Sequence, residues 1–302
     1  MSSAAIALID RDAWLAERMT GIGGSEAAAV MGANPWKSAY AVWAEKTGLA
    51  PADATENEAM EWGKRLEPVI AAKYAETTSR KIELNGASGL ELLRHPEHPY
   101  MLATIDARVY REDVPGILEI KTTGAHRAEE WLEAAPLAYQ VQLQHYLATT
   151  GLAWGSFAVL IGGQKFRWYD VERNDNFIAT LEERCAWFWD LVQRREPPPI
   201  DGSQSTTDAL RALYPQDSGA TVDLGIAAAD WADQLAAAKD RMCEAERQKR
   251  EIENKIKAAM GPATFGIVPG GGRFSFKTQR REEHVVAASE FRVLRYAKEK
   301  SK

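Results

Sequence analysis

The sequence predicts an α/β protein with helices flanking a mixed central sheet, followed by a long C-terminal helix and a β-hairpin. Helical and strand patterns interleave through the first 200 residues. A proline-rich segment at 196–202 then interrupts any helix. Beyond it, apolar residues recur at spacings of three and four. We therefore expect three parts: residues 1–200, a linker with a short helix at 201–224, and a C-terminal region at 225–302 with a basic tail.

Three helices are predicted near the N-terminus. Two short ones, at 25–31 and 38–46, begin at a serine in the N-cap position and end at a glycine. A longer helix covers 58–75. Strands are expected next, at 81–93, 101–110 and 117–121, followed by a helix at 136–150. Two more strands, at 156–161 and 165–171, and a helix at 175–193 complete this part of the chain.

The C-terminal region has a heptad-like apolar seam from Ala228 to Ala259, which predicts one long helix. Trp231 and Lys249 at seam positions are atypical of a strict two-stranded coiled coil. Gly261 and Pro262 end the helix. The segments 263–268 and 273–277 surround a glycine-rich turn and predict a β-hairpin.

The charge distribution is asymmetric. The net charge is −6, but the segment from Arg273 onward has nine Lys or Arg and four Asp or Glu, which leaves −11 on residues 1–272. The two cysteines exclude a disulfide framework and a four-cysteine iron–sulfur cluster. No membrane span or signal peptide is visible, so we expect a reduced, cytoplasmic protein.

The strongest candidates for catalytic or metal-binding residues are Asp106 and the Glu119-Ile120-Lys121 triplet. Two short apolar runs enclose a turn-like segment at 113–116, which predicts a hairpin. Glu119 and Lys121 then share one face of a strand, and Asp106 reaches that face from its neighbour. Two close carboxylates repel unless a cation lies between them, and oxygen ligands suit Mg²⁺ or Mn²⁺. The alternative is a hairpin with surface salt bridges.

This pattern resembles the core signature of the PD-(D/E)xK nuclease superfamily. Two further segments, Arg18 to Ser38 and Ala138 to Gly151, have E-W-G-K-R-L-E-P between them. In this order they resemble the YqaJ-like viral recombinase family, whose best-known relative is the lambda-type phage exonuclease. The resemblance covers roughly residues 14–200. It implies a restriction-endonuclease-like core around the predicted mixed sheet.

The resemblance also implies a function and its requirements. The implied activity is Mg²⁺-dependent hydrolysis of DNA in phage recombination, 5′→3′ on double-stranded DNA, with 3′ single-strand tails passed to an annealing protein. Asp106, Glu119 and the Ile120 carbonyl are the implied metal ligands, and Lys121 acts on the attacking water or the phosphate charge. A homo-oligomer, a trimer in the lambda-type enzyme, is implied as well. The alternatives are an endonuclease of the same superfamily and a DNA-binding or assembly module with a degenerate site.

Glu67 is expected near the metal as a third carboxylate. At 100° per residue it falls within the apolar half of the helix at 58–75, between Tyr74 and Met60. A carboxylate there is costly unless it is paired or bound to a cation. The family has an active-site glutamate at this position, whereas the alternative is a buried ion pair with an arginine.

Three further residues complete the predicted site by resemblance. Gln142, followed by Tyr146 at i+4, resembles the Q-x-x-x-Y element of these nucleases and is expected to hold water or phosphate. Gln140 and Gln144 leave its register open by two residues. Arg18 and Ser25 resemble the pocket for the DNA 5′-phosphate; in the alternative, Ser25 is only an N-cap. Trp36 either stacks on a terminal base or belongs to the core.

Overall fold

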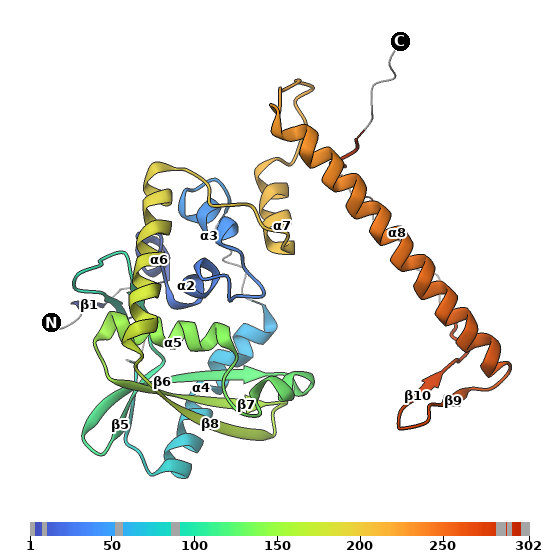
Figure 1. The fold of residues 1–302 in the computed structure, drawn as a ribbon. Coiled ribbons are helices and arrows are strands. Elements are labelled where there is room, and N and C mark those ends of the chain that lie inside the picture. The colour runs from blue at the N-terminus through green and yellow to red at the C-terminus, as the bar shows by residue number, and fades with distance from the viewer. Residues whose placement is uncertain are drawn as a thin grey trace. The chain divides into compact units, whose positions relative to one another are not determined.

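The computed structural model describes residues 4–7, 11–51, 57–85, 91–281, 288 and 292–296. It divides into two compact units, Met1–Tyr214 and Pro215–Lys302. The first unit (Figure 1) contains, in chain order, β1 (Ala4–Ala7), α1 (Arg11–Arg18), α2 (Gly24–Val30), α3 (Ala39–Lys46), α4 (Glu58–Thr78), β2 (Ile82–Leu84), β3 (Glu91–Arg94), β4 (Leu102–Ala103), β5 (Ala107–Arg111), β6 (Val114–Thr123), the 3₁₀-helix η1 (Ala125–Trp131), α5 (Leu137–Thr150), β7 (Trp154–Ile161), β8 (Lys165–Glu172), α6 (Asp175–Arg194) and α7 (Gln204–Leu213).

A five-stranded mixed sheet lies at the centre of this unit. Its strand order is β2-β5-β6-β7-β8, in which β6 and β7 are parallel and the other neighbours are antiparallel. The chain leaves β6 through η1 and α5 and returns as β7, because parallel neighbours need a crossover connection. A second, three-stranded sheet has the order β1-β3-β4. The predicted α/β class with a mixed sheet is confirmed.

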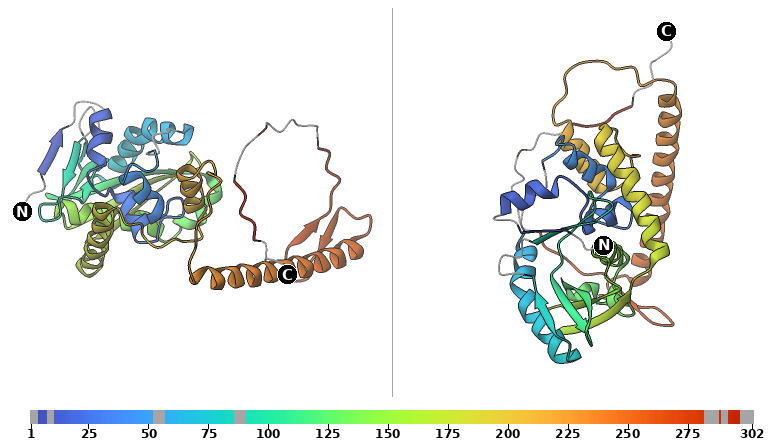
Figure 2. Two further views of the ribbon diagram at one scale, coloured as in Figure 1. Left: turned by 90° about the horizontal axis from the view of Figure 1, so that it is seen from above. Right: turned by 90° about the vertical axis from the view of Figure 1, so that its left-hand side faces the viewer.

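Helices cover both faces of the central sheet (Figures 1 and 2). Because side chains alternate along a strand, Leu118 and Ile120 of β6 pack with Ile70 and Tyr74 of α4. Ile117, of opposite parity, joins the larger core that also contains α2, α3, α5 and α6. Glu119 and Lys121 therefore belong to the face covered by α5.

The first turn of α2 lies directly on α5. A Cβ on Gly24 would come within 2.6 Å of Cε1 of Tyr146 and 2.8 Å of Cγ of Gln142, closer than real Cβ contacts. Only glycine permits this approach. It brings the segment that follows Arg18 against the helix that carries Gln142.

Several local predictions were wrong. The strand expected at 81–93 is two strands in different sheets, and its residues 86–90 lie outside the described part of the chain. The turn expected at 113–116 is a tighter one at Glu112 and Asp113, since Arg111 already pairs with Val114. Pro115 and Gly116 belong to β6, where the bare Gly116 backbone accommodates the buried Trp154 ring at 2.5 Å from an ideal Cβ.

The first unit also extends past the boundary expected near residue 200. Helix α7, predicted as part of a linker, packs on α3. Thr206 is 1% exposed, and its hydroxyl shares a hydrogen bond of 2.8 Å with Oγ of Ser38. Ser38 is in turn the N-cap of α3 and accepts a hydrogen bond from the Ala41 N–H. A buried polar contact of this kind ties α7 to the core.

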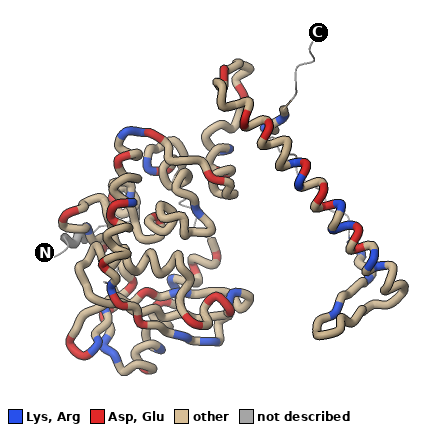
Figure 3. The backbone as a smooth tube through the Cα atoms, in the orientation of Figure 1, with Lys and Arg blue, Asp and Glu red and all other residues tan. Residues whose placement is uncertain are grey.

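The second unit contains the predicted long helix, α8 (Ala227–Met260), and a hairpin formed by β9 (Phe265–Ile267) and β10 (Arg273–Ser275). No residue of α8 is buried, and acidic and basic residues alternate along it (Figure 3). Several i,i+4 ion pairs support its exposed surface, Arg250–Glu246 and Lys255–Glu251 among them. Within the described residues, no helix has the length and apolar character needed to cross a membrane.

Candidate active site

The register of β5 and β6 brings the predicted carboxylates together. Ala107 pairs with Leu118, so Asp106 comes next to Glu119 at the end of the antiparallel ladder. Oδ2 of Asp106 accepts a hydrogen bond of 2.7 Å from the Ile120 N–H. Burial raises the pKa of Asp106, although the Lys121 ammonium and the Ile120 N–H oppose the shift.

Glu119 is 1% exposed. Its Oε1 accepts hydrogen bonds from Nζ of Lys121 at 2.6 Å and from Nε2 of Gln142 at 2.7 Å. Its Oε2 is buried and accepts no hydrogen bond from any described residue. Burial and the neighbouring Asp106 raise the pKa of Glu119 to about 8. A buried carboxylate oxygen without a partner is costly, and a cation or a hydrogen-bond donor bound there would remove this cost.

Lys121 supplies the positive charge. Burial disfavours its ammonium, but Glu119 and Asp106 outweigh this effect and raise the pKa of Lys121. Its Nζ lies 5.1 Å from the centroid of the Tyr139 ring, on α5. The lysine is therefore charged at neutral pH and held between two carboxylates and an aromatic ring.

Glu67 lies on α4 and is partly buried. It is on the same face of the helix as the buried residues Ile70, Ala71 and Tyr74. Burial raises its pKa to about 7, and the charge of Asp106 adds to the shift. The predicted apolar half of this helix is narrower than expected, because Met60, Trp62 and Val69 are exposed. Glu67 nevertheless belongs to the buried stripe. The charges of Asp106, Lys121 and Lys64 all affect its pKa. The alternative prediction was a buried ion pair between Glu67 and an arginine, and no such pair occurs among the described residues.

The structure resolves the register of the glutamines on α5. Gln142 is buried and donates to Glu119 and, at 3.1 Å, to the hydroxyl of Tyr146. Gln140 and Gln144 instead donate to the carbonyls of Ala135 and Glu172. Gln142 thus faces the carboxylates, and its amide holds the Glu119 side chain.

Arg18 and Ser25 lie beside a small pocket. Its lining residues include Gly23, Gly24, Thr104 and Tyr146 as well as Arg18 and Ser25. The expected N-cap role of Ser25 was wrong, because α2 begins one residue earlier and its N-cap is Gly23. Ser25 is exposed within the first turn. Tyr146 lines the pocket and also accepts from Gln142, so the pocket and the carboxylates are neighbours.

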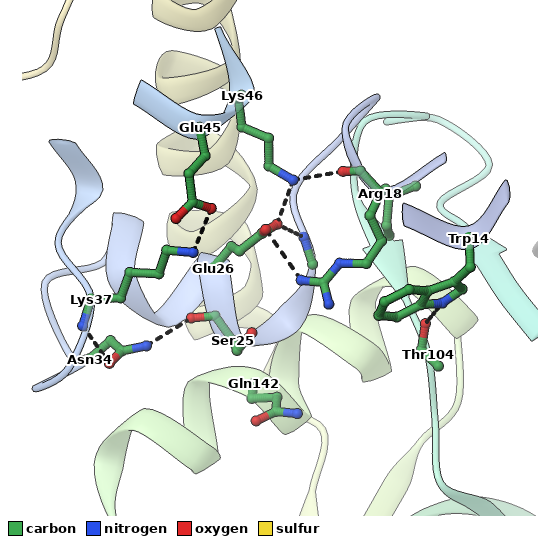
Figure 4. Close-up of polar contacts among 12 residues, drawn as sticks. Trp14, Arg18, Ser25, Glu26, Asn34, Lys37, Glu45, Lys46, Thr104 and Gln142 are labelled. Carbon is green, nitrogen blue, oxygen red and sulfur yellow. Dashed lines mark hydrogen bonds and ion pairs between the residues drawn. The ribbon is translucent and has the colours of Figure 1, made fainter. Parts of the chain in front are cut away.

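Arg18 belongs to an ion cluster with Glu26 and Lys46 (Figure 4). This cluster was not predicted from the sequence. Glu26 pairs with Nη2 of Arg18 at 3.2 Å and with Nζ of Lys46 at 2.9 Å. The Glu26 carboxylate also accepts from the Gly23 N–H at 2.7 Å. Burial opposes ionisation, but Lys46 and Arg18 outweigh it and lower the pKa of Glu26 to about 2. A glutamate three residues after the N-cap was the available signal.

Within the part of the chain that the structure describes, no cluster of three or more His, Cys, Asp or Glu side chains is arranged to hold a metal ion. Lys121 instead occupies the space beside Glu119 and Asp106. The available donors are carboxylate oxygens, with no cysteine or histidine among them, which is the chemistry that hard divalent cations prefer.

The sequence and the fold of this chain are similar to those of known proteins. The family model of the YqaJ-like viral recombinase domain matches residues 13–153. The protein YqaJ of Bacillus subtilis (strain 168) is 36% identical over 265 residues, which is 86% of this chain and 81% of that protein. The crystal structure of LHK-Exo, an alkaline exonuclease from Laribacter hongkongensis, matches with a TM-score of 0.51 and 24% identity, over 61% of this chain and 94% of that one. Its complex with dAMP matches with a TM-score of 0.50. The expected fold is confirmed.

Replacing Glu26 with Gln should destabilise the fold at neutral pH by about 3 kcal/mol, because Lys46 and Arg18 lose their buried counter-charge. A carboxyl with a lowered folded-state pKa stabilises the fold above its unfolded value, here 4.5, and loses that contribution as the pH falls toward 2. The difference in unfolding free energy between Glu26→Gln and wild type should therefore shrink across this interval. Chemical denaturation at a series of pH values measures it.

The matched control is Glu45→Gln. It removes a carboxylate from the ion pair with Lys37, whose side chain is 28% exposed, compared with 1% for Lys46. This variant should cost about 1 kcal/mol or less. An equal loss of unfolding free energy in the two variants would show that the Glu26 cluster stabilises the fold no more than a partly exposed ion pair does.

Proposed function

Because the chain belongs to the YqaJ-like viral recombinase domain family, we propose that it is a metal-dependent DNA nuclease. The observation that carries this proposal is the unpartnered, buried Oε2 of Glu119 beside Asp106 and a charged Lys121. The fold shared with LHK-Exo, named an alkaline exonuclease, supports it. The reaction is hydrolysis of a DNA phosphodiester, in the cytoplasm of a bacterial host.

The oxygen donors of the site suit a divalent cation, Mg²⁺ or Mn²⁺, with two carboxylates and a carbonyl as its ligands. Asp106 and Glu119 would hold it with the Ile120 carbonyl, and Glu67 lies close enough for its pKa to respond to Asp106. When bound, the ion would polarise the phosphoryl group and lower the pKa of a coordinated water. Its charge would also relieve the repulsion that raises the pKa of both glutamates.

The protein side chains position the reacting groups. Lys121 orients the water or stabilises the negative charge that develops on the phosphate. The Gln142 amide donates to Oε1 of Glu119 and holds the carboxylate in one orientation. Oε2, which has no partner among the described residues, is then available to the cation. Tyr146 accepts from the same amide and so fixes Gln142 in turn.

The preferred substrate is the 5′ end of double-stranded DNA. The Arg18 guanidinium and the exposed Ser25 hydroxyl suit a terminal phosphate, and Tyr146 connects their pocket to the carboxylates. Cleavage from that end is 5′→3′ exonuclease action and produces 3′ single-strand tails for an annealing protein. A homo-oligomer, such as a trimer, would suit this activity. The competing candidate is an endonuclease, which needs no pocket for an end.

Asp106→Asn and Glu119→Gln should each abolish Mg²⁺ binding, because each removes one of the few carboxylates in the site. Isothermal titration calorimetry measures the loss. Glu172→Gln is the control, since Glu172 is 63% exposed on β8 and pairs with Arg111. Unchanged Mg²⁺ affinity in both site variants would remove the metal site from the proposal.

Wild type with Mg²⁺ should degrade linear duplex DNA and leave closed circles intact. Lys121→Ala should slow this reaction roughly 10²–10³-fold, the usual loss when a preorganised electrostatic donor is removed. Lys165→Ala, an exposed lysine on β8, is the control and should retain full rate. Gel assays on matched linear and circular plasmids decide the function. Loss of both substrates indicates an endonuclease, and loss of neither indicates a binding module.

A 5′-phosphorylated duplex should be degraded faster than the same duplex with a 5′-hydroxyl. The charge-assisted contact to Arg18 is worth about 1.5–3 kcal/mol, and only the phosphate can make it. Arg18→Ala should slow the phosphorylated substrate and leave the other nearly unchanged. Single-turnover rates measure both. Equal wild-type rates on the two ends would reject the pocket and favour the endonuclease.

A further inference from the structure

Trp36 is an exposed aromatic side chain that the proposed chemistry does not use. Its side chain is 52% exposed, whereas Trp131 and Trp43 of the same unit are 1% and 4% exposed. It follows α2 in a short loop and belongs to no helix or strand. A single exposed tryptophan is unremarkable by itself. Its surroundings give it significance.

One set of contacts connects Trp36 to Lys121. The Trp36 ring lies 6.1 Å from the Tyr139 ring, which is stacked on the buried Trp131 at 5.3 Å. The Tyr139 ring is also the one that lies 5.1 Å from Nζ of Lys121. A row of aromatic rings therefore leads from the core, past the catalytic lysine, to Trp36 at the surface.

A second set of contacts connects Trp36 to Ser25. Oδ1 of Asn34 accepts hydrogen bonds from the backbone N–H groups of Trp36 and Lys37, at 2.9 and 3.1 Å. The amide of the same Asn34 donates to the carbonyl of Ser25 at 3.1 Å, as Figure 4 shows. Pro35 restricts the backbone between them. The loop is thus fastened to the first turn of α2, beside the phosphate pocket.

A cation also flanks the ring. Cζ of Arg127 lies 4.8 Å from the Trp36 ring centroid, and its guanidinium is bound at two points by Glu130. Arg127 is therefore held in place against the tryptophan. The guanidinium lies over the indole ring, and nucleobases stack both on aromatic rings and on guanidinium planes.

We propose that Trp36 is a base-stacking residue: it holds a base at the 5′ end of the DNA between the phosphate pocket and Lys121. This inference rests on the proposed function, because it places a nucleotide between those two groups. Stacking needs no hydrogen-bond match, so the contact tolerates any base. It would orient the terminal nucleotide so that its scissile phosphate meets Lys121.

The test compares two hairpin duplexes, each with one open, 5′-phosphorylated end. In one duplex the terminal nucleotides of the 5′ strand are abasic. All proteins carry Asp106→Asn, which blocks hydrolysis, and dissociation constants are measured in EDTA. The parent protein should bind the base-bearing end about 5- to 150-fold more tightly than the abasic end. Addition of Trp36→Ala should abolish this ratio by weakening only the base-bearing complex, and Trp36→Phe should largely restore it.

Trp168→Ala is the matched control. Trp168 is 38% exposed and lies 5.2 Å from an arginine, Arg80, but it packs near Tyr74 of α4, on the opposite face of the sheet. It should keep the full ratio. A Trp36→Ala protein that keeps the ratio, or a parent that binds both ends equally, overturns the stacking role and leaves the nuclease proposal intact. A parent that binds no DNA overturns both.

Discussion

The buried electrostatics around Glu119 constrain the rest of the first unit. A carboxylate that is 1% exposed requires a positive charge and a donor nearby, and Lys121 and Gln142 supply them from β6 and α5. Both contacts depend on α5 covering that face of the sheet. The crossover from β6 to β7 provides this cover, because it carries α5 over the strand that bears Glu119. Among the described residues, the other oxygen of Glu119 is buried without a hydrogen-bond partner, and this is where the proposed cation would bind.

The site is accordingly built in two layers. The first contains the carboxylates and Lys121, and the second contains Arg18 with Glu26 and Lys46. Gly24 joins them, since its missing side chain allows α2 to lie on Gln142 and Tyr146. A phosphate bound beside α2 would therefore have a defined distance from the carboxylates. Such a fixed spacing is what an end-directed enzyme needs and an endonuclease does not.

Sequence patterns predicted the order of elements well because most of them have a strong local signal. Glu119 and Lys121 share a face by strand alternation alone, and Glu67 lies on the buried stripe of α4 by helical periodicity. The failures were tertiary. Pro115 and Gly116 have turn composition, but packing of Trp154 places them in a strand. The attachment of α7 to Ser38 and the Glu26–Lys46 pair join residues too distant for any periodicity to reveal.

The same reasoning explains how an acidic protein could bind DNA, as proposed here for this chain. Affinity for phosphate arises from where cations lie, and Arg18, Lys121 and Arg127 are each held by a carboxylate: Glu26, Glu119 and Glu130. These partners lower the net charge of the chain but fix each cation in one position. Fixed cations lose little conformational entropy when a phosphate binds. A wholly basic surface would attract DNA anywhere along its length. Cations that are each fixed by a carboxylate would instead favour binding at one place.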